Sequence, residues 1–242
     1  MRIILAKDYE EMSQKAAHII AGQIIMKPDS VLGLATGSTP LGTYDSLVTM
    51  HREGLLSFRE ATSFNLDEYV GLDGTSEQSY SYFMRKNFFE KVDISMDNVF
   101  IPSGIARDVA EECDSYEEKI RRRGGIDLQL LGIGRNGHIG FNEPDVKFEA
   151  LTHLVQLDQE TIHDNARFFQ DIRQVPREAI SMGIRTILHS RRILLLASGK
   201  EKADTVRNMI HGEIKPSLPA SILQLHPDCV VILDQGAASK IV

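Results

Sequence analysis

Short apolar runs alternate along the whole chain with longer stretches in which apolar residues recur every three or four positions. The first pattern predicts buried strands, and the second predicts helices with one buried face. In the first unit, residues 3–5 are apolar, Asp8 can cap a helix, and apolar residues at helical spacing follow between Met12 and Ile24. The same rhythm predicts strands at residues 3–5, 31–35, 61–66, 98–101, 126–132, 193–197 and 229–233.

Strands that alternate with helices call for a mostly parallel sheet covered on both faces and joined by right-handed crossovers. The predicted fold is therefore α/β, a three-layer α/β/α sandwich with a Rossmann-like central sheet. A chain of 242 residues fits one domain, residues 1–242, with a sizeable core. Ligands of such sheets bind outside the carboxyl ends of the strands, so the segments that follow each strand are the candidates for a site.

The segment after the fifth predicted strand, residues 128–144, is the most informative one, with the sequence LQLLGIGRNGHIGFNEP. Its glycines leave room for the backbone to approach a ligand closely. Several polar groups stand between and after them, where a connecting turn would need only one or two. We favour a catalytic loop over a solvated polar loop. The glycines are Gly132, Gly134, Gly137 and Gly140, and the polar residues are Asn136, His138, Asn142 and Glu143.

The second predicted strand ends in Thr36, Gly37, Ser38 and Thr39, followed by Pro40. Hydroxyl groups and consecutive N–H groups at a helix N-terminus can bind a phosphate. Pro40 suits the first helical position, and Ser38 or Thr39 suits the cap. The lysine of a Walker A loop is missing. An ordinary capped turn remains an alternative for this stretch.

Asp67 and Glu68 follow the third predicted strand as adjacent carboxylates. Two neighbouring carboxylates are costly to bury, because each must find partners or take up a proton. One of them in a partly dry pocket would serve as a general base. The alternative is an acidic pair on the surface.

After the sixth predicted strand, Ser198 and Glu201 have the spacing of a capping box, which predicts a helix start. Lysines in a first helical turn oppose the helix dipole unless an anion lies nearby. We expect Lys202 to contact a ligand and Lys200 to face solvent. Residues 151–174 have weak periodicity and predict a mobile lid, in which Arg167 suits bidentate phosphate binding.

The overall charge narrows the possible partners. The net charge of −7 argues against a nucleic acid or an anionic membrane surface as the partner.

Cys113 and Cys229 are far apart and predict neither a disulfide framework nor a zinc ribbon. His138 and Glu143 lack a third clustered ligand, so we expect no catalytic metal. Because no signal peptide or membrane-spanning run is evident, a cytoplasmic protein is the simplest expectation.

Three long motifs together resemble the glucosamine-6-phosphate deaminase family, and the likeness spans nearly the whole chain. They are residues 34–40 (LATGSTP), 64–72 (FNLDEYVGL) and 132–144 (GIGRNGHIGFNEP). The resemblance implies conversion of glucosamine 6-phosphate and water into fructose 6-phosphate and ammonia, an aldose to ketose isomerisation coupled to hydrolytic deamination. It also implies a role in amino-sugar catabolism, including N-acetylglucosamine degradation, and a reaction that needs no cofactor.

The resemblance assigns roles to individual residues. His138 matches the acid/base that opens the pyranose ring, Glu143 the residue that orients this histidine, and Asn136 the third member of the relay. Asp67 matches the base that moves the C2 proton to C1. The expected substrate contacts are Thr36, Gly37, Ser38, Thr39, Gly137, Arg167 and Lys202.

Two departures separate this chain from the larger, allosteric branch of the family. Asn136 replaces an aspartate, so its amide can orient His138 but adds no charge to stabilise an imidazolium. The chain also ends at Ile241 and Val242, without the extension of the hexameric branch, which points to the short, non-allosteric and monomeric branch. A 6-phosphogluconolactonase-like hydrolase and a non-catalytic sugar-phosphate sensor domain remain as alternatives.

Overall fold

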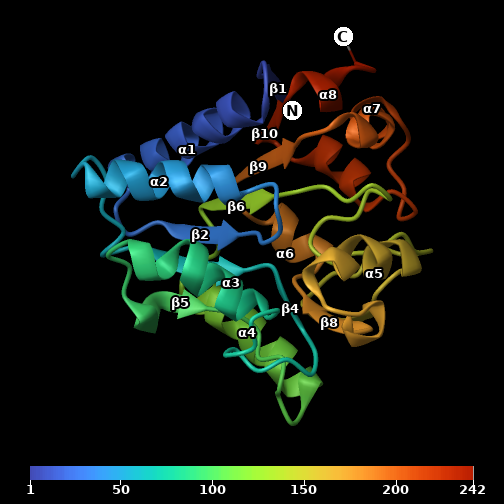
Figure 1. The fold of residues 1–242 in the computed structure, drawn as a ribbon, viewed down its shortest axis with the longest axis horizontal. Helices are drawn as coiled ribbons and strands as arrows, with labels where there is room; N and C mark the ends of the chain where they lie inside the picture. The colour runs from blue at the N-terminus through green and yellow to red at the C-terminus, as the bar shows by residue number, and fades with distance from the viewer. Residues whose placement is uncertain (242) are drawn as a thin grey trace.

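A seven-stranded sheet forms the centre of the computed structural model (Figure 1), with every neighbouring pair of strands parallel. The structure describes residues 1–241 apart from the side chain of Phe168; Val242, the last residue of the predicted domain, lies outside the described residues. In the order β1-β10-β9-β6-β2-β3-β5, the strands are β1 (Arg2–Leu5), β10 (Cys229–Leu233), β9 (Arg192–Ala197), β6 (Leu128–Leu131), β2 (Val31–Leu34), β3 (Thr62–Asn65) and β5 (Val99–Phe100).

The seven strands predicted from the sequence are the seven strands of this sheet, so the expected α/β sandwich is confirmed. Most of them are buried along their whole length, because helices cover both faces of a parallel sheet. The edge strand β5 is shorter than predicted, since it pairs with β3 through only two residues.

Right-handed crossovers place the helices in two layers, because the chain first crosses the sheet in one direction and then returns. The helices of the outward path are α1 (Tyr9–Met26), α2 (Leu41–Arg52) and α3 (Tyr80–Asn87), and α2 packs against both α1 and α3. The return path carries α4 (Val109–Arg122), α6 (Ile184–Leu188) and α7 (Ala203–His211), with α8 (Gln235–Ala238) following β10. Asp8 caps α1 as predicted, its carboxylate accepting the N–H of Glu11 at 2.8 Å. Short 3₁₀ turns lie at Phe89–Lys91, Met96–Asn98, Ala166–Phe168, Ile172–Gln174, Lys200–Lys202 and Pro219–Leu225.

A small antiparallel sheet, which the sequence did not predict, lies beside the central one. It has the order β4-β8-β7, with β4 (Asp67–Tyr69), β8 (Glu178–Ser181) and β7 (His153–Gln156). The predicted lid, residues 151–174, therefore contains a strand as well as the helix α5 (Gln159–Asn165). Its order comes from partners distant in sequence, such as the pairing of Val155 with Ala179, which periodicity cannot detect. Mobility of this segment stays a prediction.

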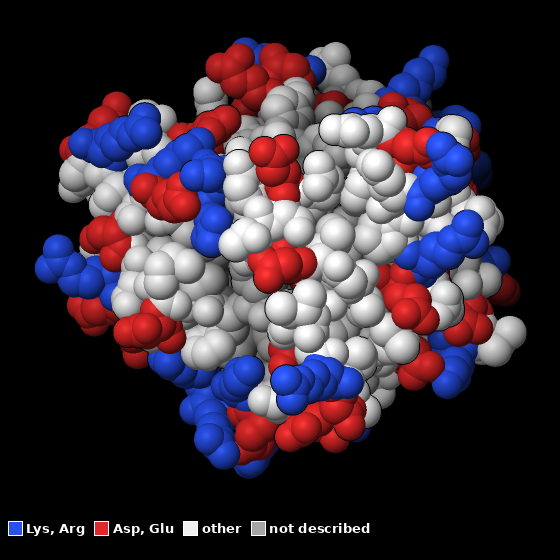
Figure 2. Space-filling view, turned by 60° about the horizontal axis from the view of Figure 1, so that its bottom comes forward, with Lys and Arg blue, Asp and Glu red and all other residues white. Residues whose placement is uncertain are grey.

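The surface carries charges of both signs. Figure 2 shows Lys and Arg interspersed with Asp and Glu, most of them around the rim of the visible face. Among the described residues, no helix is long and apolar enough to cross a membrane. Cys113 and Cys229 are buried free thiols.

Close packing at the middle of the sheet gives a prediction for stability. Gly33 of β2 lies beside Gln129 of β6, and a Cβ at Gly33 would lie 2.0 Å from Oε1 of this buried glutamine. We expect Gly33→Ala to lower the free energy of unfolding by about 1–3 kcal/mol through overpacking. Gly22→Ala is the matched control, because nothing lies within 4 Å of its Cβ and alanine favours the helix. Thermal unfolding of both variants checks this; an unchanged melting temperature for Gly33→Ala would contradict it.

Candidate active site

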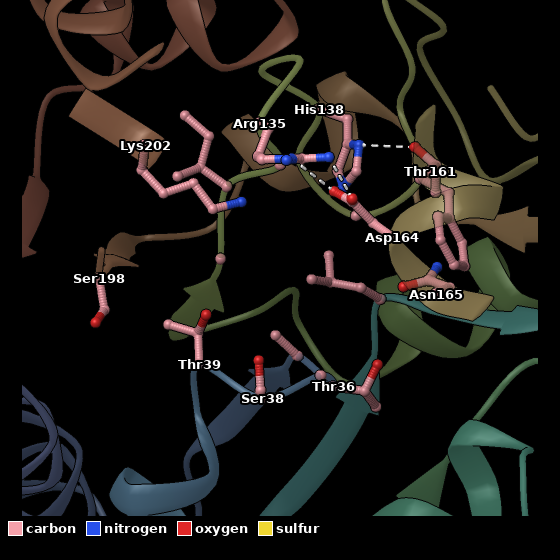
Figure 3. A pocket seen from close by; sticks show the side chains of 18 of the residues that line it. Thr36, Ser38, Thr39, Arg135, His138, Thr161, Asp164, Asn165, Ser198 and Lys202 are labelled. Atoms are coloured by element: carbon pink, nitrogen blue, oxygen red, sulfur yellow. Dashed lines mark hydrogen bonds and ion pairs between the residues drawn. The ribbon is translucent and has the colours of Figure 1, made fainter. Parts of the chain in front are cut away.

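A cavity of about 650 Å³ opens at the carboxyl ends of the central strands. It lies where β2 and β6 are neighbours, the point at which the chain leaves one strand towards β3 and the other towards β9. This is the switch in strand order at which α/β sheets bind ligands. The turn after β2, the loop after β6, the segment after β9 and the helix α5 contribute the lining (Figure 3).

The turn after β2 presents hydroxyl groups to this cavity. The predicted cap is wrong: α2 begins at Leu41, Pro40 occupies the N-cap position, and no side chain bonds the helix end. Ser38 and Thr39 therefore point into the cavity (Figure 3), and Ser38 Oγ accepts a hydrogen bond from Arg167 at 3.2 Å. Gly37 has a φ of 89°, which few other residues adopt readily.

The hydroxyl of Thr36, at the start of this turn, faces Tyr80 and partly offsets the rise that burial causes in the pKa of Tyr80. Tyr80 also lines the cavity. All four residues predicted for the turn, Thr36, Gly37, Ser38 and Thr39, thus lie at the cavity wall.

The segment after β9 brings a lysine to the same space. The predicted capping box is absent, because Ser198 donates its hydroxyl to Asp234 at 2.6 Å and α7 begins only at Ala203. Lys202 points into the cavity (Figure 3), while Lys200 is exposed, as expected. Burial is the main cause that lowers the pKa of Lys202, and the nearby positive charges of Arg135 and Arg167 add to it. A bound anion would restore the preference of this lysine for its charged form.

The adjacent carboxylates of β4 have different surroundings. Glu68 is 2% exposed and accepts the N–H groups of Tyr69, Tyr80 and Ser81 at 2.8–2.9 Å. Burial raises the pKa of Glu68 despite these three hydrogen bonds. The Glu68 carboxylate therefore holds β4 against the start of α3.

Asp67 is the carboxylate left for a ligand. It is 5% exposed and lines the cavity, and a Cβ at Gly140 would lie 3.5 Å from its Oδ2. Within the described residues no hydrogen bond reaches its carboxylate. Burial, together with the negative charge of Glu68, raises the pKa of Asp67 to about 8. The alternative of a surface acidic pair is wrong, and Asp67 has the surroundings of a general base.

The loop after β6 holds a histidine against a carboxylate. Nδ1 of His138 lies 3.3 Å from Oε2 of Glu143, and this leaves Nε2 as the ring nitrogen available to a ligand. Asn136 donates to the same Oε2 at 2.9 Å and accepts the backbone N–H of His138 at 3.1 Å. Burial raises the pKa of Glu143, but hydrogen bonds from His138, Thr161 and Asn136 outweigh it and hold this pKa below its usual value.

The glycines of this loop are needed for its packing. A Cβ at Gly134 would lie 2.4 Å from the His138 ring, and one at Gly137 would lie 2.2 Å from Leu218. Gly137, whose φ is 90°, faces the Pro219–Leu225 turn, where its carbonyl accepts the N–H of Ala220 at 2.9 Å. It is not among the residues that line the cavity, so its predicted substrate contact stays a prediction.

Sequence reasoning missed several lining residues. Thr161, Asp164 and Asn165 come from α5, and Arg135 comes from the loop itself. Because α5 is short and the preceding strand β7 pairs with residues distant in sequence, the spacing of apolar residues does not mark these positions. Among the residues that the structure describes, no group of three or more His, Cys, Asp or Glu side chains could hold a metal ion.

Fold and site together define an α/β protein whose cavity, at the carboxyl edge of its sheet, combines cations suited to an anionic ligand with a histidine and a buried carboxylate suited to proton transfer. The chain belongs to the family of glucosamine-6-phosphate isomerases and 6-phosphogluconolactonases, whose model matches residues 7–232.

Individual relatives agree with this assignment. The chain is 55% identical over 241 residues to a glucosamine-6-phosphate deaminase of Clostridioides difficile (strain 630), covering 100% of this chain and 97% of the relative. It is similar to the solved structure of a monomeric glucosamine-6-phosphate deaminase, with a TM-score of 0.97, 50% identity and coverage of 99% and 100%. A 6-phosphogluconolactonase from Trypanosoma cruzi shares the fold at a TM-score of 0.79, with 22% identity and coverage of 100% and 97%.

Proposed function

We propose that the protein converts glucosamine 6-phosphate and water into fructose 6-phosphate and ammonia. The observation that carries this proposal is the position of Asp67, a buried carboxylate that no hydrogen bond reaches from the described residues and that faces the same cavity as His138 and the cations. The names of the relatives at 50–55% identity support the same reaction.

Substrate binding begins with the phosphate. Arg167, Lys202 and the hydroxyls of Ser38 and Thr39 supply two positive charges and hydrogen-bond donors at one end of the cavity. Binding a group that does not react holds the sugar in register with the reacting residues.

His138 then opens the ring. It moves a proton from the C1 hydroxyl to the ring oxygen, so that the C1–O5 bond breaks and an aldehyde forms at C1. Glu143 stabilises the imidazolium that exists during this transfer, since it lies 3.3 Å from Nδ1. Asn136 keeps Glu143 in place through its hydrogen bond of 2.9 Å.

Asp67 performs the isomerisation. The aldehyde acidifies the C2 proton, which Asp67 removes while water protonates O1, so that an enolamine forms. Asp67 then delivers its proton to C1. The resulting C2 iminium adds water, its C–N bond breaks and ammonia leaves, so that C2 becomes the ketone. The deamination is therefore hydrolytic, although the electrons are rearranged within the sugar.

Hydrolysis of a lactone, the alternative reaction, would require fewer of the residues in this site. Hydrolysis of 6-phosphogluconolactone needs no base at C2, and the lactonase structures similar to this chain support only the shared fold. For the sensor alternative we find no observation that favours it.

We further propose a monomer that acts in amino-sugar catabolism, including N-acetylglucosamine degradation, in the cytoplasm. The monomeric state of the similar deaminase structure supports the first part. We also propose that residues 1–242 form a single domain with residues 151–174 as its lid, because α5 from this segment covers one side of the cavity.

A direct test measures ammonia and fructose 6-phosphate formed from glucosamine 6-phosphate by the purified protein, with a chelator present. Both products are expected. Hydrolysis of 6-phosphogluconolactone without ammonia release would assign the lactonase reaction instead. Binding of the phosphosugar without turnover would assign a sensor.

The phosphate contacts give a second prediction. We expect Lys202→Met to raise KM for glucosamine 6-phosphate by about 10–100-fold, because a hydrogen bond to a charged group contributes roughly 1.5–3 kcal/mol. Lys200→Met is the matched control, since Lys200 is exposed next to the same turn. Steady-state kinetics of both variants check this prediction. An equal change of KM in the two would contradict it.

A further inference from the structure

The lid helix α5 contacts the catalytic histidine directly. Thr161 is 3% exposed, and its Oγ1 lies 3.3 Å from Nδ1 of His138 (Figure 3). The Thr161 hydroxyl also lies close enough to Glu143 to lower the pKa of that carboxyl. Glu143 accepts a further hydrogen bond, at 3.4 Å, from the backbone N–H of Asp158, the residue that caps α5. The relay is thus held from its own loop by Asn136 and from the lid by Thr161 and Asp158.

The protons in this cluster can be assigned. A threonine hydroxyl has one proton to donate and lone pairs to accept. An ionised carboxylate can only accept, so the Thr161 hydroxyl, whose presence lowers the pKa of Glu143, is oriented to donate towards it. Its lone pair then faces Nδ1 of His138, as does Oε2 of Glu143. With two acceptors beside it, Nδ1 carries the proton, and Nε2 of the neutral ring keeps the lone pair that can accept the C1 hydroxyl proton.

An ion pair fixes the position of Thr161. One turn further along α5, Asp164 pairs with Arg135, which stands between Gly134 and Asn136 in the catalytic loop (Figure 3). Nε of Arg135 donates to Asp164 at 3.0 Å and lies 3.6 Å from Glu160. The carbonyl of Arg135 accepts the hydroxyl of Thr205 on α7. Helix and loop are therefore joined at two points, the ion pair and the Thr161 contact.

We propose that Thr161 is a positioning residue that holds His138 in the tautomer and orientation needed for ring opening, and that it does so only while α5 is packed on the loop. This inference rests on the proposed function. It makes the lid a part of the acid–base machinery as well as a cover for the cavity.

The test compares Thr161→Val, which removes the hydroxyl at nearly constant volume, with Thr161→Ser, which keeps it. Thr161→Val should lower kcat/KM for glucosamine 6-phosphate by about tenfold. The loss should fall on kcat, with little change of KM, because the phosphate contacts of the substrate are untouched. Thr161→Ser should stay within about threefold of the unmodified protein. Affinity for the C1-reduced, open-chain analogue of the substrate should change in neither variant, since that analogue has no ring to open.

Thr186→Val is the matched control, because Thr186 is buried and donates to the carboxylate of Glu117 at 2.8 Å outside the cavity. It should leave kcat and KM unchanged. An unchanged kcat in Thr161→Val, or an equal loss in Thr161→Ser, would overturn the inference while ammonia release by the unmodified protein still supports the proposed function. Absence of ammonia release from the unmodified protein would overturn both.

Discussion

Replacement of Asp67 by asparagine should lower kcat for ammonia release from glucosamine 6-phosphate by about 10²–10⁴-fold, the usual contribution of a well-placed general base. Asparagine has nearly the same shape but cannot take the C2 proton. KM should change little, because Asp67 does not contribute to the positive end of the cavity formed by Arg167 and Lys202. Steady-state kinetics and exchange of the C2 proton with solvent deuterium measure both effects.

The control is Asp29→Asn, an exposed aspartate two residues before β2 and therefore at the opposite end of the strands. It should retain full activity. If Asp67→Asn exchanged the C2 proton at the unmodified rate, another group would have to be the base.

The pH dependence of kcat/KM in the unmodified protein should also follow the titration of Asp67. The pKa of Asp67 is raised to about 8, so the free protein loses its base as the pH falls below that value. We expect kcat/KM to decrease with falling pH in this range.

The pKa of Asp67 also has a consequence for stability. A carboxyl whose pKa is higher in the folded state favours folding most below its unfolded pKa, and this contribution is lost as the pH rises from about 4 to about 8. At pH 8 the buried charge therefore opposes folding, and Asp67→Asn removes it. We expect the variant to melt roughly 5–10 °C higher than the unmodified protein at pH 8, with a smaller difference at pH 5. Equal melting temperatures at both values would show that the carboxylate is not buried as a charge.

Replacement of His138 by glutamine should lower kcat/KM for the cyclic substrate by about 10²–10⁴-fold, because glutamine has no basic ring nitrogen to move a proton between the C1 hydroxyl and the ring oxygen. Asp67 remains intact in this variant. The small open-chain fraction of the sugar in solution should still react. A fast initial phase is therefore expected, followed by a slow phase limited by uncatalysed ring opening.

Rapid-mixing measurements of ammonia release separate the two phases. His18→Gln serves as the control, since His18 is exposed on α1, where its Nδ1 contacts the carbonyl of Gln14 at 2.7 Å. Loss of both phases in His138→Gln would mean that this residue also acts after ring opening.

The seven central strands and the edge at which the site lies were predictable from the chain alone. Strands covered by helices on both faces must be apolar along their length, so they stand out as short runs. The carboxyl ends of parallel strands meet at one edge, and so the segments containing Thr36, Asp67, His138 and Lys202 could be assigned to one site. Motifs of these segments also indicated the family, which the comparisons confirmed.

Local signals were misleading where a distant partner competed for the same group. Ser198 has the spacing of a capping residue, but its hydroxyl bonds to Asp234, 36 residues away. The strand at His153–Gln156 depends on pairing with Glu178–Ser181, which no pattern within the lid reveals. Spacing describes neighbours along the chain, and these contacts are between residues that only the fold brings together.

The division of roles between Asp67 and Glu68 shows most clearly what the tertiary structure decided. The two carboxylates are adjacent in sequence and chemically alike. Three backbone N–H groups hold the buried Glu68 carboxylate. Asp67 is buried at the cavity with no donor among the described residues, and its pKa is raised. Thr161 reaches His138 for the same kind of reason, because the second sheet places α5 above the catalytic loop. Residue types and the positions of the central strands along the chain could be predicted from the sequence, while hydrogen-bond partners and desolvation arose only from packing of the complete chain.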